Sequence, residues 1–372
     1  MIYLDNSATS LQKPKNVAQA VAYAIHNYAS VGRGGYSAAM QAAKAVDDCR
    51  VAASELFECE PEQVVFTLNA THALNIAIKS LVPPNGRVAI SGFEHNAVWR
   101  PLQALNADIQ ICGRKLFDPT NTIAEFEAAL EQPLDAVVCT HVSNVFGYRL
   151  PIESIAELCK QQGVPLIIDA SQSAGILPVS LRSLGAAFIA MPGHKGLYGP
   201  QGTGVLLCGR LPQSLMEGGT GSLSMSPEMP DFLPDRAEAG THNVCGICGL
   251  AAGIRFVKER STTAIRQHEL GICRRIAKQI ETSDLQVFYT GQDCQIGVLS
   301  FVIKDVDCET AAMWLAKRGC CVRAGLHCAP LAHESAGTLE SGTVRISPSA
   351  FTTPAEADRA AFLIRTLATA KI

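Results

Sequence analysis

Lys195 is the first residue whose surroundings suggest chemistry. It lies in Pro192-Gly193-His194-Lys195-Gly196, immediately after the apolar run 187–191, which is typical of a buried strand. A lysine amine at the edge of a sheet can form a Schiff base where its surroundings favour the neutral form. Most lysines are instead solvated surface groups, so this motif alone leaves both interpretations open.

Asp169 is the second such residue, because it ends the apolar run 166–168. A carboxylate at the end of a buried strand needs a specific cationic partner. A pyridinium nitrogen is one such partner, since the carboxylate keeps it protonated and makes the ring an electron sink. The carboxylate could equally cap a following helix, and the spacing does not separate the two roles.

Cys328 and Arg345 are the candidate reactive residues near the C-terminus. Cys328 lies in the segment 323–330 (RAGLHCAP), where a nearby Arg or His would stabilise its thiolate. Arg345 stands in the alternating pattern 344–347, and a substrate carboxylate could satisfy its guanidinium through two parallel hydrogen bonds. An incidental loop cysteine and a structural ion pair are the competing interpretations.

Cys245 and Cys248 form a CxxC pair without a second pair at zinc spacing, so packing is favoured over a metal or redox site. The glycine-rich run 196–204 matches neither the dinucleotide fingerprint nor the P-loop and indicates a turn. The sequence therefore predicts no metal site.

Composition excludes several classes of protein. The chain has 372 residues, is 48% hydrophobic and 17% charged, and carries a net charge of −3, which gives no basic field for nucleic acid or an anionic membrane. Its N-terminus does not resemble a signal peptide, and no apolar run is long enough to cross a bilayer. We therefore expect a cytoplasmic protein whose 14 cysteines are mostly buried, reduced thiols.

The pattern of apolar runs predicts the fold. Candidate strands alternate with helical stretches, which indicates a mainly parallel, doubly wound α/β sheet with ligands at the carboxyl ends of its strands. These strands are 64–67, 87–91, 136–141, 165–169, 187–191 and 204–208, and one intervening helix is 152–162.

Beyond about residue 255, a helix over 254–280, a strand at 297–303 and a helix at 309–317 indicate a smaller α+β domain. The predicted division is an N-terminal arm (1–14) packing with the small domain, a large domain (15–255) and the small domain (256–372) carrying Cys328.

Together these motifs resemble the cysteine desulfurase and selenocysteine lyase family of class V aminotransferase-like enzymes. The resemblance runs nearly end to end, and its most specific parts are Gly193-His194-Lys195 with Tyr198-Gly199-Pro200, the segment 169–172 (DASQ) and the segment 238–241 (EAGT). It implies pyridoxal 5'-phosphate (PLP) as cofactor. It also implies the PLP-dependent transferase fold type I, with a mainly parallel seven-stranded sheet in the large domain.

The resemblance implies roles for individual residues. Lys195 would be the Schiff-base lysine, Asp169 the partner of the pyridine nitrogen, and His95 the histidine that stacks on the ring. Gln172 would donate to the ring hydroxyl oxygen, and Asn144 would lie beside ring and substrate. The phosphate would be held by Ala70, Thr71, His72 and His194, and by Thr241 of the neighbouring subunit of a homodimer with shared active sites. Arg345 would hold the substrate carboxylate, and Arg33 would line the entrance.

Two positions depart from the family pattern. Pro192 stands where many relatives have a serine, so one phosphate contact is lost and the affinity for the cofactor would be lower. His72 stands where many relatives have an acid, and it could compensate in charge. The short interval between Cys328 and Arg345 resembles the group with a compact cysteine loop, which implies a partner protein that collects the sulfur.

The implied reaction converts L-cysteine to L-alanine and leaves a persulfide on Cys328 for an acceptor. Selenocysteine lyase activity on L-selenocysteine is the nearest alternative, and Cys328 would matter less for that substrate. Another PLP reaction, such as transamination or cystine lysis, is a further enzymatic alternative. A non-catalytic scaffold that binds sulfur-relay proteins is the alternative from a different class.

Overall fold

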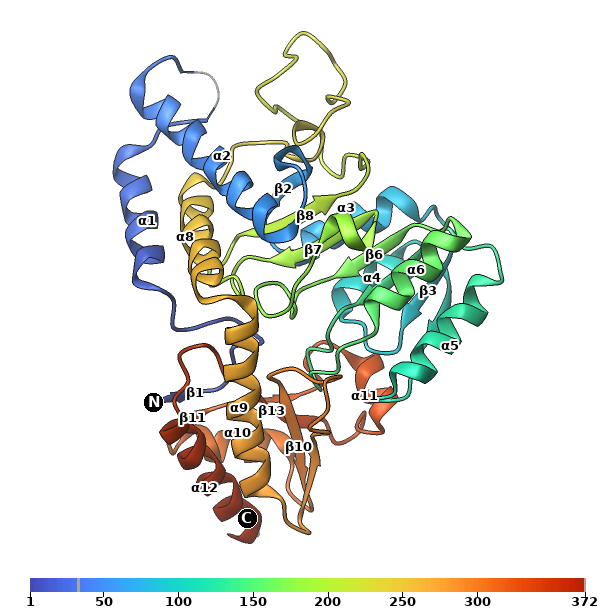
Figure 1. Cartoon of the computed structure of the whole chain (residues 1–372), viewed down its shortest axis with the longest axis vertical. Helices are drawn as coiled ribbons and strands as arrows, with labels where there is room; N and C mark the ends of the chain where they lie inside the picture. Colours follow the sequence, from blue (N-terminus) through green and yellow to red (C-terminus); the bar gives the residue numbers. More distant parts are fainter. Residues whose placement is uncertain (32–33, 371–372) are drawn as a thin grey trace.

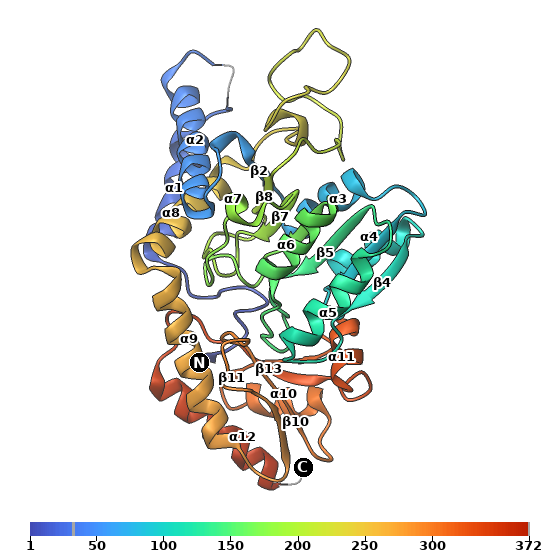
Figure 2. The ribbon, with the colours of Figure 1, turned by 45° about the vertical axis from the view of Figure 1, so that its right-hand side comes forward.

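The structure is a computed structural model that describes residues 1–31 and 34–370. Its larger part is a seven-stranded sheet with helices on both faces, and the C-terminal part packs below it in both views around a smaller sheet (Figures 1 and 2). No helix in the described ranges is long and apolar enough to cross a membrane.

The large sheet is mainly parallel, as the sequence predicts. Only β8 runs antiparallel to its neighbours β2 and β7, and every other pair in this sheet is parallel. The strand order is β2 (Val64–Thr67), β8 (Gly204–Cys208), β7 (Phe188–Pro192), β6 (Leu166–Asp169), β5 (Ala136–Thr140), β3 (Arg87–Ser91) and β4 (Asp108–Cys112).

Both faces of this sheet are buried, which explains why its strands are continuous apolar runs. In β6, Ile167 points into the core beneath one layer of helices and Ile168 into the core beneath the other. The first layer holds α3 (Ala70–Leu81) and α4 (Asn96–Ala104). The second holds α2 (Ser37–Phe57), α5 (Pro119–Leu130), α6 (Ile152–Gln162) and α8 (Val244–Arg260), with α1 (Lys15–Asn27) packed on α8. The connections include α7 (Leu181–Leu184) and the 3-10 helices η1 (Pro61–Gln63) and η2 (Asp235–Ala237).

The C-terminal part has its own antiparallel sheet and its own core. The sheet order is β12 (Arg323–Gly325), β13 (Thr343–Ile346), β10 (Leu299–Ile303) and β9 (Leu285–Phe288). Its core is closed by α9 (Thr262–Ile280), α10 (Cys308–Ala316) and α12 (Pro354–Ala370), and α11 (Pro330–Ala336) follows the Cys328 loop. The N-terminal strand β1 (Ile2–Tyr3) pairs in parallel with β11 (Cys320–Cys321).

One expectation about a single element is wrong, and one strand of the large sheet was not located. The helix predicted over 254–280 is divided at Ser261, whose φ of 68° ends α8 and whose side chain accepts a hydrogen bond from the Ala264 amide at the start of α9. The seventh strand, β4, was not among the predicted runs, because it is an edge strand with alternating exposure. The predicted boundary at 255/256 falls inside α8, and the division into domains stays a prediction.

Candidate active site

A cavity of about 220 Å³ lies at the carboxyl ends of the central strands. It is lined by the last residues of β5 and β6, Thr140 and Asp169, by residues that end or follow β7, and by the N-terminal turns of α3 and α4. Of the predicted cofactor residues, it gathers Ala70, Thr71, His95, Asn144, Asp169, Gln172, His194 and Lys195. The carboxyl-end rule for parallel sheets therefore places these side chains in one cavity.

Lys195 is half-buried and lines this cavity, and desolvation there lowers the pKa of its amine to about 8. The nearby Asp169 carboxylate acts in the opposite direction and raises that pKa. A substantial fraction of the amine is therefore neutral near physiological pH, which is the form that attacks a carbonyl carbon.

Asp169 ends β6 and does not cap a helix. Its Oδ1 accepts a hydrogen bond of 2.8 Å from the Ser171 amide in a turn, and the next helix, α7, begins only at Leu181. The carboxylate is buried and lines the cavity. Of the two roles open from the sequence, the geometry therefore favours a partner inside the cavity.

His95 precedes α4 and caps it with its own ring. Its Nδ1 accepts a hydrogen bond of 3.0 Å from the Ala97 amide, so a proton on the neutral ring belongs to Nε2. Burial, together with Lys195, lowers the pKa of His95 to about 4. The ring is therefore neutral at physiological pH.

The start of α3 forms the end of the cavity suited to an anion. Asn69 caps this helix by accepting a hydrogen bond of 2.9 Å from the His72 amide, and Ala70 and Thr71 line the cavity. A helix N-terminus favours a phosphate. His194 faces the same cavity with a buried Nδ1 that has no hydrogen-bond partner among the described residues. Asn69 was missed by the sequence analysis, although an Asn directly before a helix is a recognisable capping signal.

Two predicted cofactor residues, His72 and Thr241, line a neighbouring cavity instead. The His72 ring accepts a hydrogen bond from the Leu68 amide, and burial lowers its pKa, which disfavours a compensating positive charge. Pro192 does line the main cavity and offers neither a hydroxyl nor an N–H there. Arg33 lies outside the described residues.

Cys328 is the exposed member of the chain's 14 cysteines, all of which lie in the described ranges. Its carbonyl oxygen accepts a hydrogen bond of 2.7 Å from the Asn96 amide, directly after His95. The carbonyl oxygen of His327 accepts one of 2.8 Å from Asn144 Nδ2. The cysteine loop is thus attached to two elements that build the cavity.

Arg345 approaches the same region from β13 and is only 2% exposed. Its Nη1 donates to the Asn144 carbonyl oxygen at 2.9 Å, and its Nη2 lies 2.7 Å from Asp5 Oδ1. Its Nε is buried without a partner among the described residues. The guanidinium therefore takes part in an ion pair while keeping one free donor.

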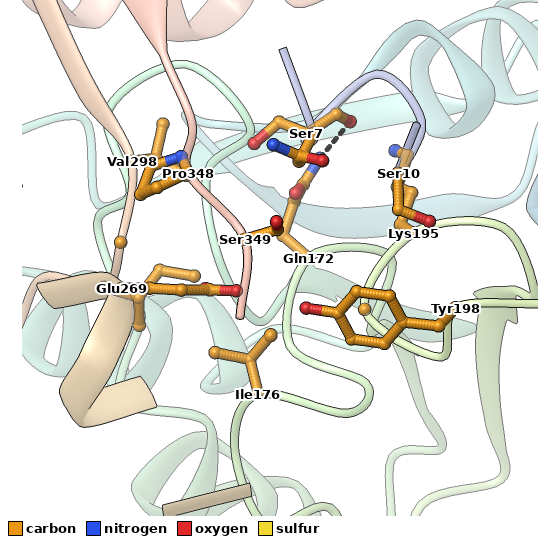
Figure 3. Close-up of a pocket in the computed structure, with 14 residues that line it drawn as sticks. Ser7, Ser10, Gln172, Ile176, Lys195, Tyr198, Glu269, Val298, Pro348 and Ser349 are labelled. Carbon is orange, nitrogen blue, oxygen red and sulfur yellow. Dashed lines mark hydrogen bonds between the residues drawn. The ribbon is translucent and has the colours of Figure 1, made fainter. Parts of the chain in front are cut away.

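A second, smaller cavity adjoins Lys195 on the side facing the C-terminal sheet (Figure 3). Glu269 of α9 points into it opposite Tyr198, and no hydrogen bond or ion pair links its carboxyl to another described residue. Burial raises the pKa of Glu269 well above its usual value, so the neutral acid is favoured. The sequence analysis missed this acid because it lies in a helix with charged residues throughout.

The Cys245–Cys248 pair lies in the first turns of α8, and both thiols are free. Within the described ranges, no group of three or more His, Cys, Asp or Glu side chains is arranged to hold a metal ion.

Comparison with known proteins identifies the family. The aminotransferase class-V family model matches residues 2–360. A probable cysteine desulfurase of Methanothermobacter thermautotrophicus is 31% identical over 95% of this chain and 92% of the relative, and a cysteine desulfurase of Shigella flexneri is 31% identical over 88% and 84%. The apo structure of a cysteine desulfurase from Thermococcus onnurineus superposes with a TM-score of 0.91, at 28% identity, over 99% of this chain and 95% of the other. These likenesses confirm the predicted fold class, and the chain belongs to the aminotransferase class-V family and, within it, to the cysteine desulfurase family.

Proposed function

We propose that this protein is a PLP-dependent cysteine desulfurase that converts L-cysteine to L-alanine and keeps the sulfur as a persulfide on Cys328. One observation carries the proposal: Asn96 and Asn144 bond the exposed Cys328 loop to the elements that build the cavity. The same cavity contains Lys195, whose pKa is lowered. This arrangement supports a site in which a carbonyl-reactive amine and a sulfur acceptor work together.

The residues of the cavity fit PLP at both ends. Lys195 would hold the cofactor covalently, and Asp169 would face its pyridine nitrogen. The N-terminus of α3 and the unpartnered Nδ1 of His194 suit its phosphate. When bound, PLP supplies an electron sink for a carbanion at the substrate α-carbon.

The chain's own residues would then act in sequence. The Lys195 amine would remove the α-proton of the substrate, because its pKa lies near the working pH. The neutral His95 ring, which lines the cavity and carries its proton on Nε2, would move a proton to or from the substrate. Arg345 exchanges its bond with Asp5 for the substrate carboxylate, to which it also offers its free Nε–H.

Sulfur transfer needs Cys328 as thiolate. A new S–S bond forms between Cys328 and the substrate sulfur while the Cβ–S bond of the substrate breaks. The electron pair of the broken bond passes to the three-carbon fragment, which takes up protons and leaves as alanine. An acceptor protein then collects the persulfide sulfur at the exposed Cys328. A homodimer in which Thr241 reaches the partner's phosphate site, and a cytoplasmic location, belong to the same proposal.

The deciding experiment measures alanine formation from L-cysteine by PLP-loaded protein. Cys328→Ser should abolish it, while Cys294→Ser, which removes a half-buried thiol remote from the cavity, should leave it unchanged. Full alanine formation by Cys328→Ser would refute the persulfide role. The same pair assayed with L-selenocysteine tests the lyase alternative, for which Cys328→Ser would remain active.

A further inference from the structure

His327 precedes Cys328, and its ring is buried although the neighbouring Cys328 is exposed. The ring stacks on that of His333, with centroids 5.7 Å apart and planes inclined by 23°. Its Nε2 lies 3.1 Å from Thr343 Oγ1 and 3.2 Å from the Thr343 carbonyl oxygen. A carbonyl oxygen only accepts, so His327 Nε2 carries the proton and anchors the loop to β13.

The backbone at this point is strained. His327 and Cys328 have φ values of 50° and 56°, so two consecutive residues with side chains adopt the left-handed region. Residues with side chains rarely adopt this region and persist there only where their surroundings impose the conformation. A hydrogen bond of 2.9 Å from the Ala329 amide to the Leu326 carbonyl closes the turn around the two residues. The anchored His327 ring and the bonds to both backbone carbonyls add to this restraint.

The strained pair is bonded to the elements that build the cavity. The carbonyl of His327 is bonded to Asn144, which lines the cofactor cavity, and the carbonyl of Cys328 is bonded to the Asn96 amide. If the ring left its place between His333 and Thr343, both residues could relax to ordinary φ values. The direction of the Cys328 side chain would then change relative to the cavity.

We propose that His327 is a positioning residue, which holds Cys328 in the left-handed conformation that presents its thiol to the substrate sulfur. The inference rests on the proposed function, in which Cys328 receives the sulfur. It adds a residue that never touches substrate and acts through its bond to Thr343. Burial lowers the pKa of His327 to about 2, so the ring keeps one protonation state and donates the same hydrogen bond across the working pH range.

The test uses PLP-loaded variants and measures kcat and KM for alanine formation, together with bound cofactor. His327→Phe keeps an aromatic ring against His333 but removes the donor. It should lower kcat roughly 10- to 100-fold, as expected for misplacing a reacting atom by about 1 Å, and leave KM and cofactor content within about twofold. Thr343→Val, which removes one of the two acceptors, should show a smaller loss of the same kind.

Two matched controls separate positioning from general damage to the loop. Thr343→Ser keeps the hydroxyl acceptor and should behave like the wild type. Leu326→Ala changes an exposed side chain of the same loop and should also be neutral. The midpoints of the pH–rate profile should coincide in His327→Phe and the wild type, because the neutral ring transfers no proton.

The inference is overturned if His327→Phe and Thr343→Val both keep wild-type kcat. It is equally overturned if their activity falls only in proportion to lost cofactor, or if the pH profile moves. Cys328→Ser distinguishes a failure of the positioning role of His327 from a failure of the proposed function of Cys328. An inactive Cys328→Ser beside a fully active His327→Phe removes the positioning role alone, whereas an active Cys328→Ser removes the proposed function and the inference with it.

Discussion

The Asp5 carboxylate and the Arg345 guanidinium, 340 residues apart in the sequence, form an ion pair with 2.7 Å between Oδ1 and Nη2. Asp5 therefore accepts a hydrogen bond from Arg345 Nη2, although the proposed function assigns this guanidinium to the substrate carboxylate. Substrate binding exchanges one carboxylate for another, which limits the gain in binding free energy.

Asp5→Asn is expected to lower the KM for L-cysteine. The amide oxygen still accepts a hydrogen bond but no longer competes as an anion, and a gain of about 1.4 kcal/mol would correspond to a tenfold change. Steady-state kinetics of alanine formation measure the effect, and Asp5→Glu serves as the charge-conserving control. A KM that rises in Asp5→Asn would show that Asp5 orients Arg345 for the substrate instead of competing with it.

Cofactor uptake by the apo protein should depend on the protonation of Lys195. Only the neutral amine attacks the PLP aldehyde, so the rate should rise with pH and level off above about 8, the pKa of Lys195. Asp169→Asn removes a charge that raises this pKa and should shift the midpoint to lower pH. Stopped-flow absorbance after mixing with PLP follows the reaction, and Lys195→Ala should give no covalent product and no turnover. A rate independent of pH would contradict this role of the lysine.

Pro192→Ser should strengthen PLP binding. Pro192 lines the cavity, and serine would supply the hydroxyl and the N–H that proline lacks. A charge-assisted hydrogen bond is worth about 1.5–3 kcal/mol, so the Kd should fall roughly tenfold or more. Pro192→Ala, which restores only the N–H, divides the effect between the two groups. Equal Kd values for all three proteins, measured by equilibrium dialysis, would show that no phosphate oxygen lies within reach of residue 192.

Glu269→Gln should stabilise the protein at neutral and alkaline pH. Burial raises the pKa of this carboxyl above its unfolded value. The native state therefore binds a proton that the unfolded state has lost, and stability decreases as pH rises above the unfolded pKa of about 4.3. The amide removes this dependence, and each unit of pKa shift corresponds to about 1.4 kcal/mol. Thermal unfolding of both proteins between pH 5 and 9 measures the slope, and parallel curves would show that Glu269 is ionised in the native state.

The strand pattern located Asp169 and Lys195, and the family resemblance supplied the other predicted residues of the cavity. Asp169 ends β6 and Lys195 follows β7, so the topology of a parallel sheet brings them together. The pairing of Arg345 with Asp5 was not predictable, since no local pattern relates residues 340 apart. The edge strand β4 was missed because its partly exposed residues do not form a continuous apolar run. The helix break was missed because a single residue, Ser261, adopts an unusual φ within an otherwise helical pattern.

The N-terminal arm crosses from one sheet to the other. Ile2 bonds to Gly319 and Asp5 to Arg345 in the C-terminal part, while the Ser10 amide donates to the His194 carbonyl, directly before Lys195. During synthesis the arm leaves the ribosome more than 300 residues before these C-terminal partners. Non-local contacts of this kind close late because their loop entropy is large. The nascent chain can therefore build its parallel sheet first, and the Asp5–Arg345 pair forms only after β13 has emerged from the ribosome.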